Sequence, residues 1–93
     1  MEKKYFKWDS NKNKKLIKDR GISFDEIIQG IENNASHLIM QNPSREGQFL
    51  LAIFIKGYCW AVPFVVEDDD IMVLKTAYKS RKLRRLFDEK GSL

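Results

Sequence analysis

The sequence predicts a single α+β domain: two N-terminal helices, a small antiparallel sheet of three to four strands, and a C-terminal helix. Three observations lead to this prediction. A Ser-x-x-Glu pattern at Ser23 marks the start of a helix. Two long apolar segments, 49–55 and 58–66, flank a two-residue turn. The chain has 93 residues, 43% of them hydrophobic, which suffices for one core but not for two. Residues 1–93 are therefore expected to form one domain.

The chain begins with a short aromatic segment followed by a basic helix. Residues 5–8 read as a strand, or as an extended lead-in that packs against the body of the domain. Asp9 or Ser10 is the expected cap of a helix over residues 11–19. Gly21 stands where a left-handed residue commonly ends a helix, so the first helix is expected to stop there.

The second helix has the clearest start signal in the chain. Ser23 and Glu26 form a capping box, in which each side chain accepts a hydrogen bond from the other residue's backbone N–H. Ile22 and Ile27 occupy the positions of a hydrophobic staple around this cap. Apolar residues then recur at helical spacing until the pair at 33–34, where the helix is expected to end.

After residue 36 the apolar spacing becomes extended. Strands are predicted over residues 37–40, 49–55, 58–66 and 71–77, with loops at 42–47 and 67–70. Lys56 and Gly57 suit a tight hairpin between the second and third of these strands. Pro63 has no N–H to donate, so it is expected at a bulge, at a sheet edge or at an unpaired backbone position. A terminal helix is predicted over residues 79–90.

Composition narrows the possible functions. Cys59, the single cysteine, lies in an apolar run and is expected to be a buried thiol in a reducing compartment. His37, the single histidine, excludes a mechanism that needs two imidazoles. No nucleotide-cofactor, zinc-finger or hydrolase motif occurs, so neither a cofactor nor a metal is expected, and the acidic run 68–70 is interpreted as a solvated turn. No apolar run is long enough to cross a bilayer, so we expect a cytoplasmic protein without a membrane partner.

The charges of the chain are unevenly distributed. Residues 1–20 hold eight Lys or Arg and three Asp or Glu, residues 75–90 hold seven and two, and residues 21–74 hold two and eight. If the two basic ends meet in the fold, they form one positive surface suited to a phosphate backbone. The alternative is two separate solvated helix faces.

Several Lys and Arg residues lie where the last predicted strand leads into the terminal helix. Arg81, Arg84 and Arg85 are spaced i, i+3 and i+4, so they share one helix face while the apolar residues face the sheet. A helix N-terminus with nearby guanidinium groups suits RNA phosphate. The alternative is an amphipathic helix whose basic outer face binds nothing.

Short motifs occur along the chain in a fixed order: Phe6-Lys7-Trp8-Asp9, Arg20-Gly21-Ile22-Ser23, Asn42-Pro43-Ser44-Arg45-Glu46, Val62-Pro63-Phe64-Val65, Leu74-Lys75-Thr76-Ala77-Tyr78 and Ser80-Arg81-Lys82. In this order they resemble the BrnT-type toxins of bacterial toxin–antitoxin pairs, over roughly residues 5–87. The resemblance implies a RelE-like fold, with helices beside a small antiparallel sheet that carries a basic, RNA-cutting cleft. It also implies a cognate antitoxin protein as partner.

The resemblance implies a metal-independent endoribonuclease. In metal-free cleavage the 2′-hydroxyl attacks the adjacent phosphate, so the enzyme must transfer protons and stabilise charge on the phosphorane oxygens. Charge stabilisation is assigned to Arg45 and Arg81, with Lys79 or Lys82 assisting. The remaining backbone contacts to RNA are assigned to Lys18, Arg20, Lys75, Arg84 and Arg85.

Two side chains are candidates for proton transfer, namely Tyr78 and Glu46. Alternatively, Tyr78 stacks on a base, as aromatic residues often do in single-stranded RNA sites. Two positions depart from the more common BrnT pattern: Arg20 stands where a histidine is usual, and Thr76-Ala77-Tyr78 replaces Ser-Ala-Arg. No histidine role is therefore carried over, and the catalytic charge moves to Arg81.

The predicted function is an mRNA interferase that inhibits translation, acts on free or ribosome-associated messenger RNA, and is neutralised by its antitoxin. One alternative is a catalytically silent nucleic-acid- or protein-binding module of the same fold. A second is a protein whose basic ends only confer solubility and whose function lies in protein association. The mRNA interferase and the nucleic-acid-binding module should both bind RNA with steep salt dependence, whereas a protein that only associates with other proteins should not bind RNA.

Overall fold

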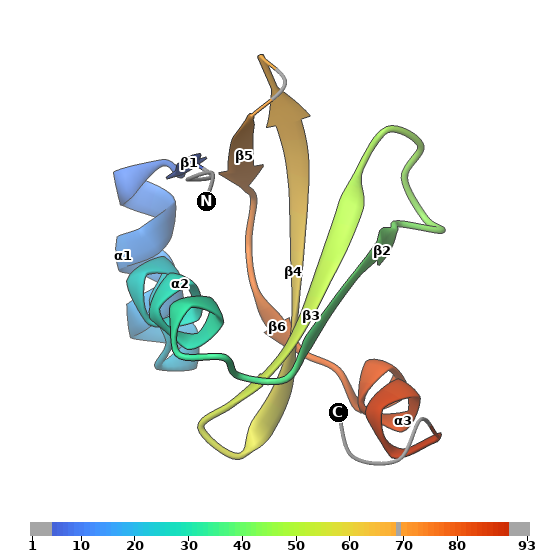
Figure 1. Cartoon of the computed structure of the whole chain (residues 1–93). Coiled ribbons are helices and arrows are strands. Elements are labelled where there is room, and N and C mark those ends of the chain that lie inside the picture. The colour runs from blue at the N-terminus through green and yellow to red at the C-terminus, as the bar shows by residue number, and fades with distance from the viewer. Residues whose placement is uncertain (1–4, 69, 90–93) are drawn as a thin grey trace.

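The computed structural model describes residues 5–68 and 70–89. Within them, one twisted sheet carries α1 and α2 on one face and α3 beside the other (Figure 1). The elements in chain order are β1 (Tyr5–Lys7), α1 (Ser10–Arg20), α2 (Phe24–Glu32), β2 (His37–Gln41), β3 (Phe49–Ile55), β4 (Tyr58–Glu67), β5 (Ile71–Leu74), β6 (Tyr78–Lys79) and α3 (Arg81–Glu89). The predicted order of helices and strands is thus confirmed. The predicted number of strands and their purely antiparallel pairing are wrong.

The sheet of the described residues has six strands and is mixed, whereas three to four antiparallel strands were predicted. The strand order is β1-β5-β4-β3-β2, and β6 also pairs with β4. β1 runs parallel to β5, with Tyr5 opposite Ile71, while the other pairs are antiparallel. The segment predicted as a strand or a lead-in is therefore a strand. Its parallel partner lies near the other end of the chain, so no local turn signals the pairing.

The predicted strand over 71–77 is two strands separated by a break. β5 ends at Leu74, and after the break Tyr78 pairs with Ala61 of β4. The prediction that residue 79 begins the terminal helix is wrong, because Lys79 belongs to β6. The Ser80 hydroxyl accepts a hydrogen bond from the Leu83 N–H at 3.1 Å, so Ser80 caps α3. The predicted end of this helix at residue 90 lies outside the described residues.

Pro63 explains where the break falls. Its carbonyl accepts a hydrogen bond from the Lys75 N–H at 2.9 Å. The N and the carbonyl of one strand residue point to the same side, so the missing N–H of Pro63 also faces the gap between β5 and β6. The position is therefore unpaired on the donor side, which was one of the three predicted settings for Pro63.

Local turn and cap signals are confirmed. Lys56 and Gly57 have φ values of 55° and 80°, as a tight two-residue hairpin turn requires. Asp9, one of the two predicted caps, accepts from the Asn11 N–H at 2.8 Å. Gly21 ends α1 at φ 70°. β4 extends to Glu67, so the predicted turn at 67–70 begins one residue later, and its residue 69 lies outside the described residues.

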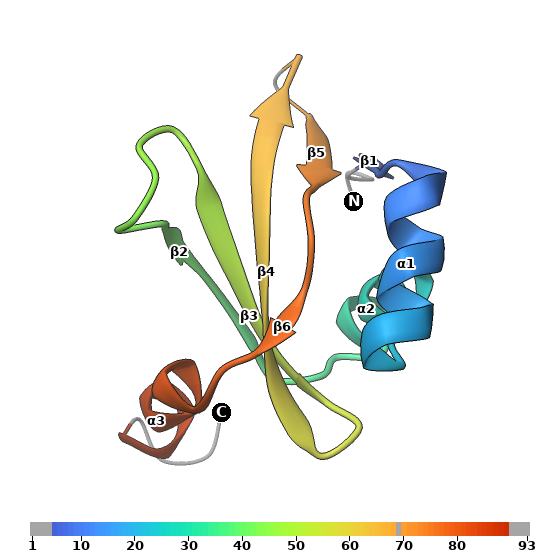
Figure 2. The same ribbon diagram turned by 180° about the vertical axis from the view of Figure 1, so that it is seen from behind.

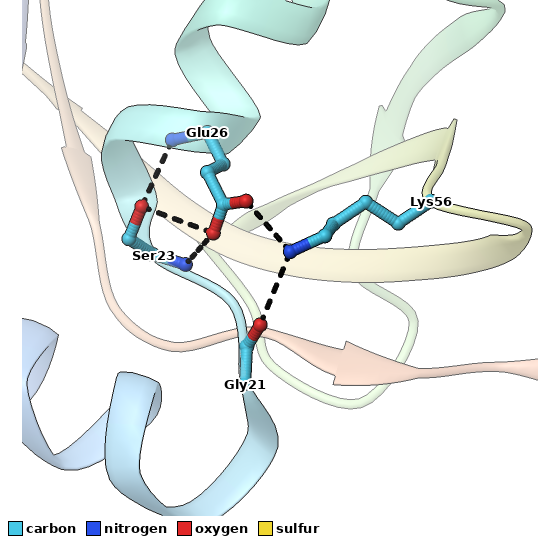
Figure 3. Close-up of polar contacts among 4 residues, drawn as sticks. All are labelled: Gly21, Ser23, Glu26 and Lys56. Carbon is cyan, nitrogen blue, oxygen red and sulfur yellow. Dashed lines mark hydrogen bonds and ion pairs between the residues drawn. The ribbon is translucent and has the colours of Figure 1, made fainter.

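The capping box joins the start of α2 to the β3–β4 hairpin (Figure 3). The Ser23 hydroxyl accepts from the Glu26 N–H, and a Glu26 carboxylate oxygen accepts from the Ser23 N–H, both at 3.0 Å. The other carboxylate oxygen lies 2.7 Å from Lys56 Nζ, which also reaches the Gly21 carbonyl at 3.4 Å. The hydrogen bond from Lys56 is the main reason that the pKa of Glu26 is lowered.

Two apolar clusters lie on the two faces of the sheet. The larger one joins α1 and α2 to β3, β4 and β5, and includes the fully buried Phe24, Ile27 and Ile53. The smaller one joins Phe87 of α3 to Ala52 and Cys59. Burial raises the pKa of the Cys59 thiol, as expected for a structural cysteine.

His37 lies exposed on β2, an edge strand, with its Nδ1 atom 2.7 Å from the Ala35 carbonyl oxygen. It therefore has the strand-edge position expected of it. Within residues 5–68 and 70–89, no helix is long and apolar enough to cross a membrane.

Candidate nucleic-acid interface

Three hollows are lined in part by the segment formed by residues 75–79. This segment leads from β5 into β6 and runs beside β4 (Figure 2). The sheet groove has a volume of about 530 Å³ and is lined by Lys12, Asn42, Ser44, Arg45, Gln48, Pro63, Lys75, Thr76 and Tyr78. The helix pocket, about 280 Å³, is lined by Lys12, Lys15, Leu16, Asp19, Arg20, Lys75 and Thr76. The aromatic pocket, about 380 Å³, is lined by Asp19, Arg20, Trp60, Tyr78 and Lys79.

The cations that line the sheet groove come from three separate parts of the chain. Lys12 comes from α1, Arg45 from the β2–β3 loop and Lys75 from the break after β5. Tyr78 of β6 lies among them with 39% of its surface exposed. No carboxylate is among the described residues that line this groove. The groove is therefore a cationic site with one phenol.

The β2–β3 loop holds Arg45 through its own hydrogen bonds. The Asn42 N–H donates to the Gln48 carbonyl at 2.9 Å, and the Asn42 side chain accepts from the Ser44 N–H at 2.9 Å. The Arg45 N–H donates to the Asn42 carbonyl at 3.3 Å, and the Arg45 carbonyl accepts from the Gln48 N–H at 3.2 Å. The loop closes on itself, so the backbone of Arg45 is fixed while its side chain is exposed.

The structure brings together part of the predicted site. Arg45, Lys75 and Tyr78 share the sheet groove, and Arg20 and Lys79 join Tyr78 in the aromatic pocket. Glu46 does not face the groove with them. It lines a separate hollow, about 270 Å³ in volume, on the side of the loop formed by Gln41, Asn42, Gly47, Gln48 and Phe49.

The cations of α3 are placed apart from this group. Arg81, Lys82, Arg84 and Arg85 are exposed and line none of these hollows, and the same holds for Lys18 of α1. The Arg84 guanidinium lies 5.3 Å from the Phe54 ring centroid, on the face of the sheet that α3 covers. The two basic ends therefore meet only in part: α1 meets residues 75–79, while the basic face of α3 is separate.

Two cations of the aromatic pocket have structural contacts of their own. Arg20 Nη1 donates to the Ala77 carbonyl at 2.6 Å. Lys79 Nζ lies 3.7 Å from the Tyr58 ring centroid and 5.7 Å from that of Trp60. The hydrogen bond holds Arg20 beside the pocket. Lys79 is held there because a cation above an aromatic face is attracted to it. Within residues 5–68 and 70–89, the buried Trp60 Nε1 has no hydrogen-bond partner.

Sequence reasoning missed the contribution of α1 to the site. Lys12, Lys15 and Asp19 line the hollows, and none was assigned a role from the sequence. A signal was available, since these residues follow the helical spacing i, i+3, i+7 and flank the buried Leu16. Because Leu16 packs against the core, the side chains next to it on α1 also lie close to the sheet.

No protein-family model matches the sequence, and no curated protein matches it significantly. Among solved structures, the crystal structure of the Brucella abortus ribonuclease toxin BrnT is similar. The TM-score is 0.63 at 15% sequence identity, over 86% of this chain and 100% of that chain. The chain has a BrnT-like fold. The resemblance predicted from the motifs is thereby confirmed at the level of fold, and within this BrnT-like fold the sheet groove lies between α1 and the β2–β3 loop.

Proposed function

We propose that the chain is the toxin of a bacterial type II toxin–antitoxin pair, and that it cuts RNA in the sheet groove without a metal ion. One observation carries the proposal: cations from three separate segments, Lys12, Arg45 and Lys75, surround Tyr78 in one groove. The BrnT-like fold supports it, since the similar solved structure is that of a ribonuclease toxin. The messenger RNA that is cut, and the resulting inhibition of translation, belong to the same proposal.

The chemistry follows from the groups in the groove. The RNA 2′-hydroxyl loses its proton to solvent water as its oxygen attacks the adjacent phosphorus. The bond from phosphorus to the 5′-oxygen breaks, and negative charge accumulates on the non-bridging oxygens in between. Arg45 offers a fork of donors to these oxygens, and Lys12 and Lys75 add positive charge. The Tyr78 hydroxyl gives a proton to the departing 5′-oxygen and regains one from water, because it is the one proton donor on an aromatic ring among the described residues that line the groove.

The other predicted site residues have outer roles in this proposal. Glu46 takes part in proton transfer if the RNA extends over the loop into the neighbouring hollow. Lys18 and the cations of α3, Arg81, Lys82, Arg84 and Arg85, contact the RNA backbone beyond the groove. Arg81 was predicted as a catalytic residue, and its absence from the lining of the groove favours a binding role. A cognate antitoxin inhibits the protein by covering the groove.

A catalytically silent binding module is the second candidate function. Two observations favour it: Arg20 is engaged by the Ala77 carbonyl, and Lys79 by the Tyr58 ring. Cations held in this way suit RNA binding. Only Arg45, Lys12 and Lys75 then remain in the sheet groove to stabilise charge in a cleavage reaction. In this case RNA binds with steep salt dependence and is not cut.

Induced expression in a bacterial host separates the two functions. The wild-type chain is expected to arrest growth and to cause decay of total RNA. A variant with both Arg45→Ala and Tyr78→Phe is expected to allow normal growth, and Lys14→Ala, an exposed cation on α1 outside the hollows, is expected to behave like the wild type. Normal growth with intact RNA, despite expression of folded wild-type protein, would count against the enzyme and favour the binding module.

A further inference from the structure

The aromatic pocket adjoins the sheet groove, and the two share Tyr78 of β6. Its volume of about 380 Å³ falls within the usual range for ligand sites, about 300–1,000 Å³. An RNA strand whose phosphate lies in the groove therefore has a second hollow within reach of a neighbouring nucleotide. The walls of this hollow combine aromatic rings with charged groups of both signs.

Asp19 sets this pocket apart from a simple phosphate site. It is the one carboxylate among the described residues that line the three hollows. It is exposed, and it makes no ion pair with the described residues, although Lys15 and Arg20 line the helix pocket beside it. A carboxylate repels phosphate, so its presence in a cationic surface weakens backbone binding. Its chemistry suits a group that donates hydrogen bonds.

Guanine fits this arrangement better than the other RNA bases. A carboxylate accepts two hydrogen bonds from neighbouring donors, and only guanine presents two such donors side by side, N1–H and the N2 amino group. Adenine and cytosine each place a donor beside an acceptor, and uracil has one N–H between two carbonyls. Arg20 and Lys79 supply donors for the guanine acceptors O6 and N7, and exposed Tyr78 offers a ring for stacking.

We propose that the aromatic pocket binds a guanine base next to the phosphate in the groove, and that Asp19 determines this base preference. The proposal rests on the proposed function, because it takes RNA as the substrate. It goes further by naming the base that the protein selects. It applies equally to a protein that binds RNA and does not cut it, so it can be tested separately from cleavage.

The test uses fluorescent pentanucleotides with 2′-O-methyl groups, which cannot be cut by 2′-oxygen attack. Their central base is guanine, inosine or adenine in an otherwise uridine sequence, and binding is measured by fluorescence anisotropy. Wild-type protein is expected to prefer guanine over adenine by about tenfold, as two hydrogen bonds to a charged group warrant. Inosine, which keeps N1–H and lacks the N2 amino group, should bind with intermediate affinity.

Asp19→Asn is expected to abolish the guanine preference, because the amide offers a donor where guanine also has one. Its affinity for the adenine oligonucleotide should equal or exceed that of wild type, since a negative charge has been removed. Glu32→Gln is the matched control: it removes one exposed acid from α2 and should keep the preference for guanine.

The possible outcomes are distinct. A guanine preference that Asp19→Asn removes and Glu32→Gln retains supports the inference. Equal binding of all three oligonucleotides by wild type, or a preference that survives Asp19→Asn, overturns it and leaves the RNA-binding proposal intact. Failure of folded protein to bind any oligonucleotide overturns the inference together with the proposed function.

Discussion

Arg20 Nη1 donates a hydrogen bond to the Ala77 carbonyl at 2.6 Å, and this contact ties the end of α1 to the break between β5 and β6. Ala77 is fully buried, so its carbonyl depends on such a partner. The contact lies where the helix pocket and the aromatic pocket adjoin, and Arg20 lines both. An arginine predicted only to bind RNA therefore also holds two walls of the candidate interface together.

Replacing Arg20 with alanine should lower stability as well as RNA affinity. The loss of a partly buried charged hydrogen bond is expected to cost about 1 kcal/mol in the free energy of unfolding, measured by urea denaturation. Lys18 is an exposed cation of the same helix and has no hydrogen-bond or ion-pair partner among the described residues. Lys18→Ala should therefore change stability by less than about 0.5 kcal/mol. Equal stability of the Arg20 and Lys18 variants would show that the contact contributes nothing.

The ion pair between Glu26 and Lys56 should make stability depend on pH. Because the folded-state pKa of Glu26 is lowered, its contribution is complete above the ordinary carboxyl pKa and is lost as the pH falls through the folded pKa. Glu26→Gln keeps the capping-box acceptor and removes the charge. The Glu26 side chain is 39% exposed, so solvent screening keeps the expected wild-type advantage at pH 7 below about 1 kcal/mol.

Denaturation of wild type and Glu26→Gln at a series of pH values tests this expectation. The difference between them should shrink as the pH falls below about 4.3, the ordinary pKa of a glutamate. A difference that stays constant down to pH values well below this would mean that the ion pair is not its source. Lys56→Met, which removes the partner instead, should reproduce the effect at neutral pH.

Gly30 illustrates a conflict between helix propensity and packing. An alanine Cβ at this position of α2 would lie 2.9 Å from Ile55 Cγ2 and 3.1 Å from Ile53 Cδ1. Overpacking of about 1–3 kcal/mol should outweigh a helix gain of about 1 kcal/mol. Gly30→Ala is therefore expected to be less stable than wild type in thermal or urea unfolding. Gln29→Ala, at an exposed position of the same helix, should be neutral or stabilising, and a stabilised Gly30→Ala would contradict the close packing of α2 on β3.

The groove cations should be visible in the salt dependence of RNA binding. Lys12 lines two of the hollows, whereas Lys14, on another face of α1, lines none of them. If Lys12 neutralises one phosphate of single-stranded RNA, Lys12→Ala should reduce the slope of log affinity against log salt by about 0.7. Lys14→Ala should leave the slope unchanged. Equal effects of both variants would mean that binding depends on overall charge and not on the groove.

The parts of the fold that could be predicted from the sequence are those determined by neighbouring residues. The capping box at Ser23 and the turn at Lys56-Gly57 are local, because each depends on a few residues whose backbone preferences are known. For the same reason, Pro63 could be limited to a bulge, a sheet edge or an unpaired backbone position, and the structure shows the last of these. The bounds of most helices and strands accordingly agree with the prediction to within one or two residues.

The parts that could not be predicted depend on contacts between distant segments. Tyr5 pairs with Ile71 in parallel, and no turn residue announces such a pairing. The break after Leu74 depends on Pro63 in another strand, so the segment 71–77 resembles one continuous strand in isolation. For the site, residue types indicated a basic surface, but only packing decides that Lys12 joins Arg45 while Arg81 does not.

Cleavage of labelled single-stranded RNA by the purified protein, in buffer that contains a metal chelator, is the most direct measurement of all. We expect the wild type to cut and to leave 2′,3′-cyclic phosphate ends, as attack by the 2′-oxygen requires. Arg45→Ala should lower the rate by about a hundredfold or more, the usual effect of removing one group that stabilises transition-state charge. Lys14→Ala should cut at the wild-type rate. Absence of cleavage by folded wild-type protein, or cleavage that Arg45→Ala leaves unchanged, would contradict the assignment of the groove as an RNA-cutting site.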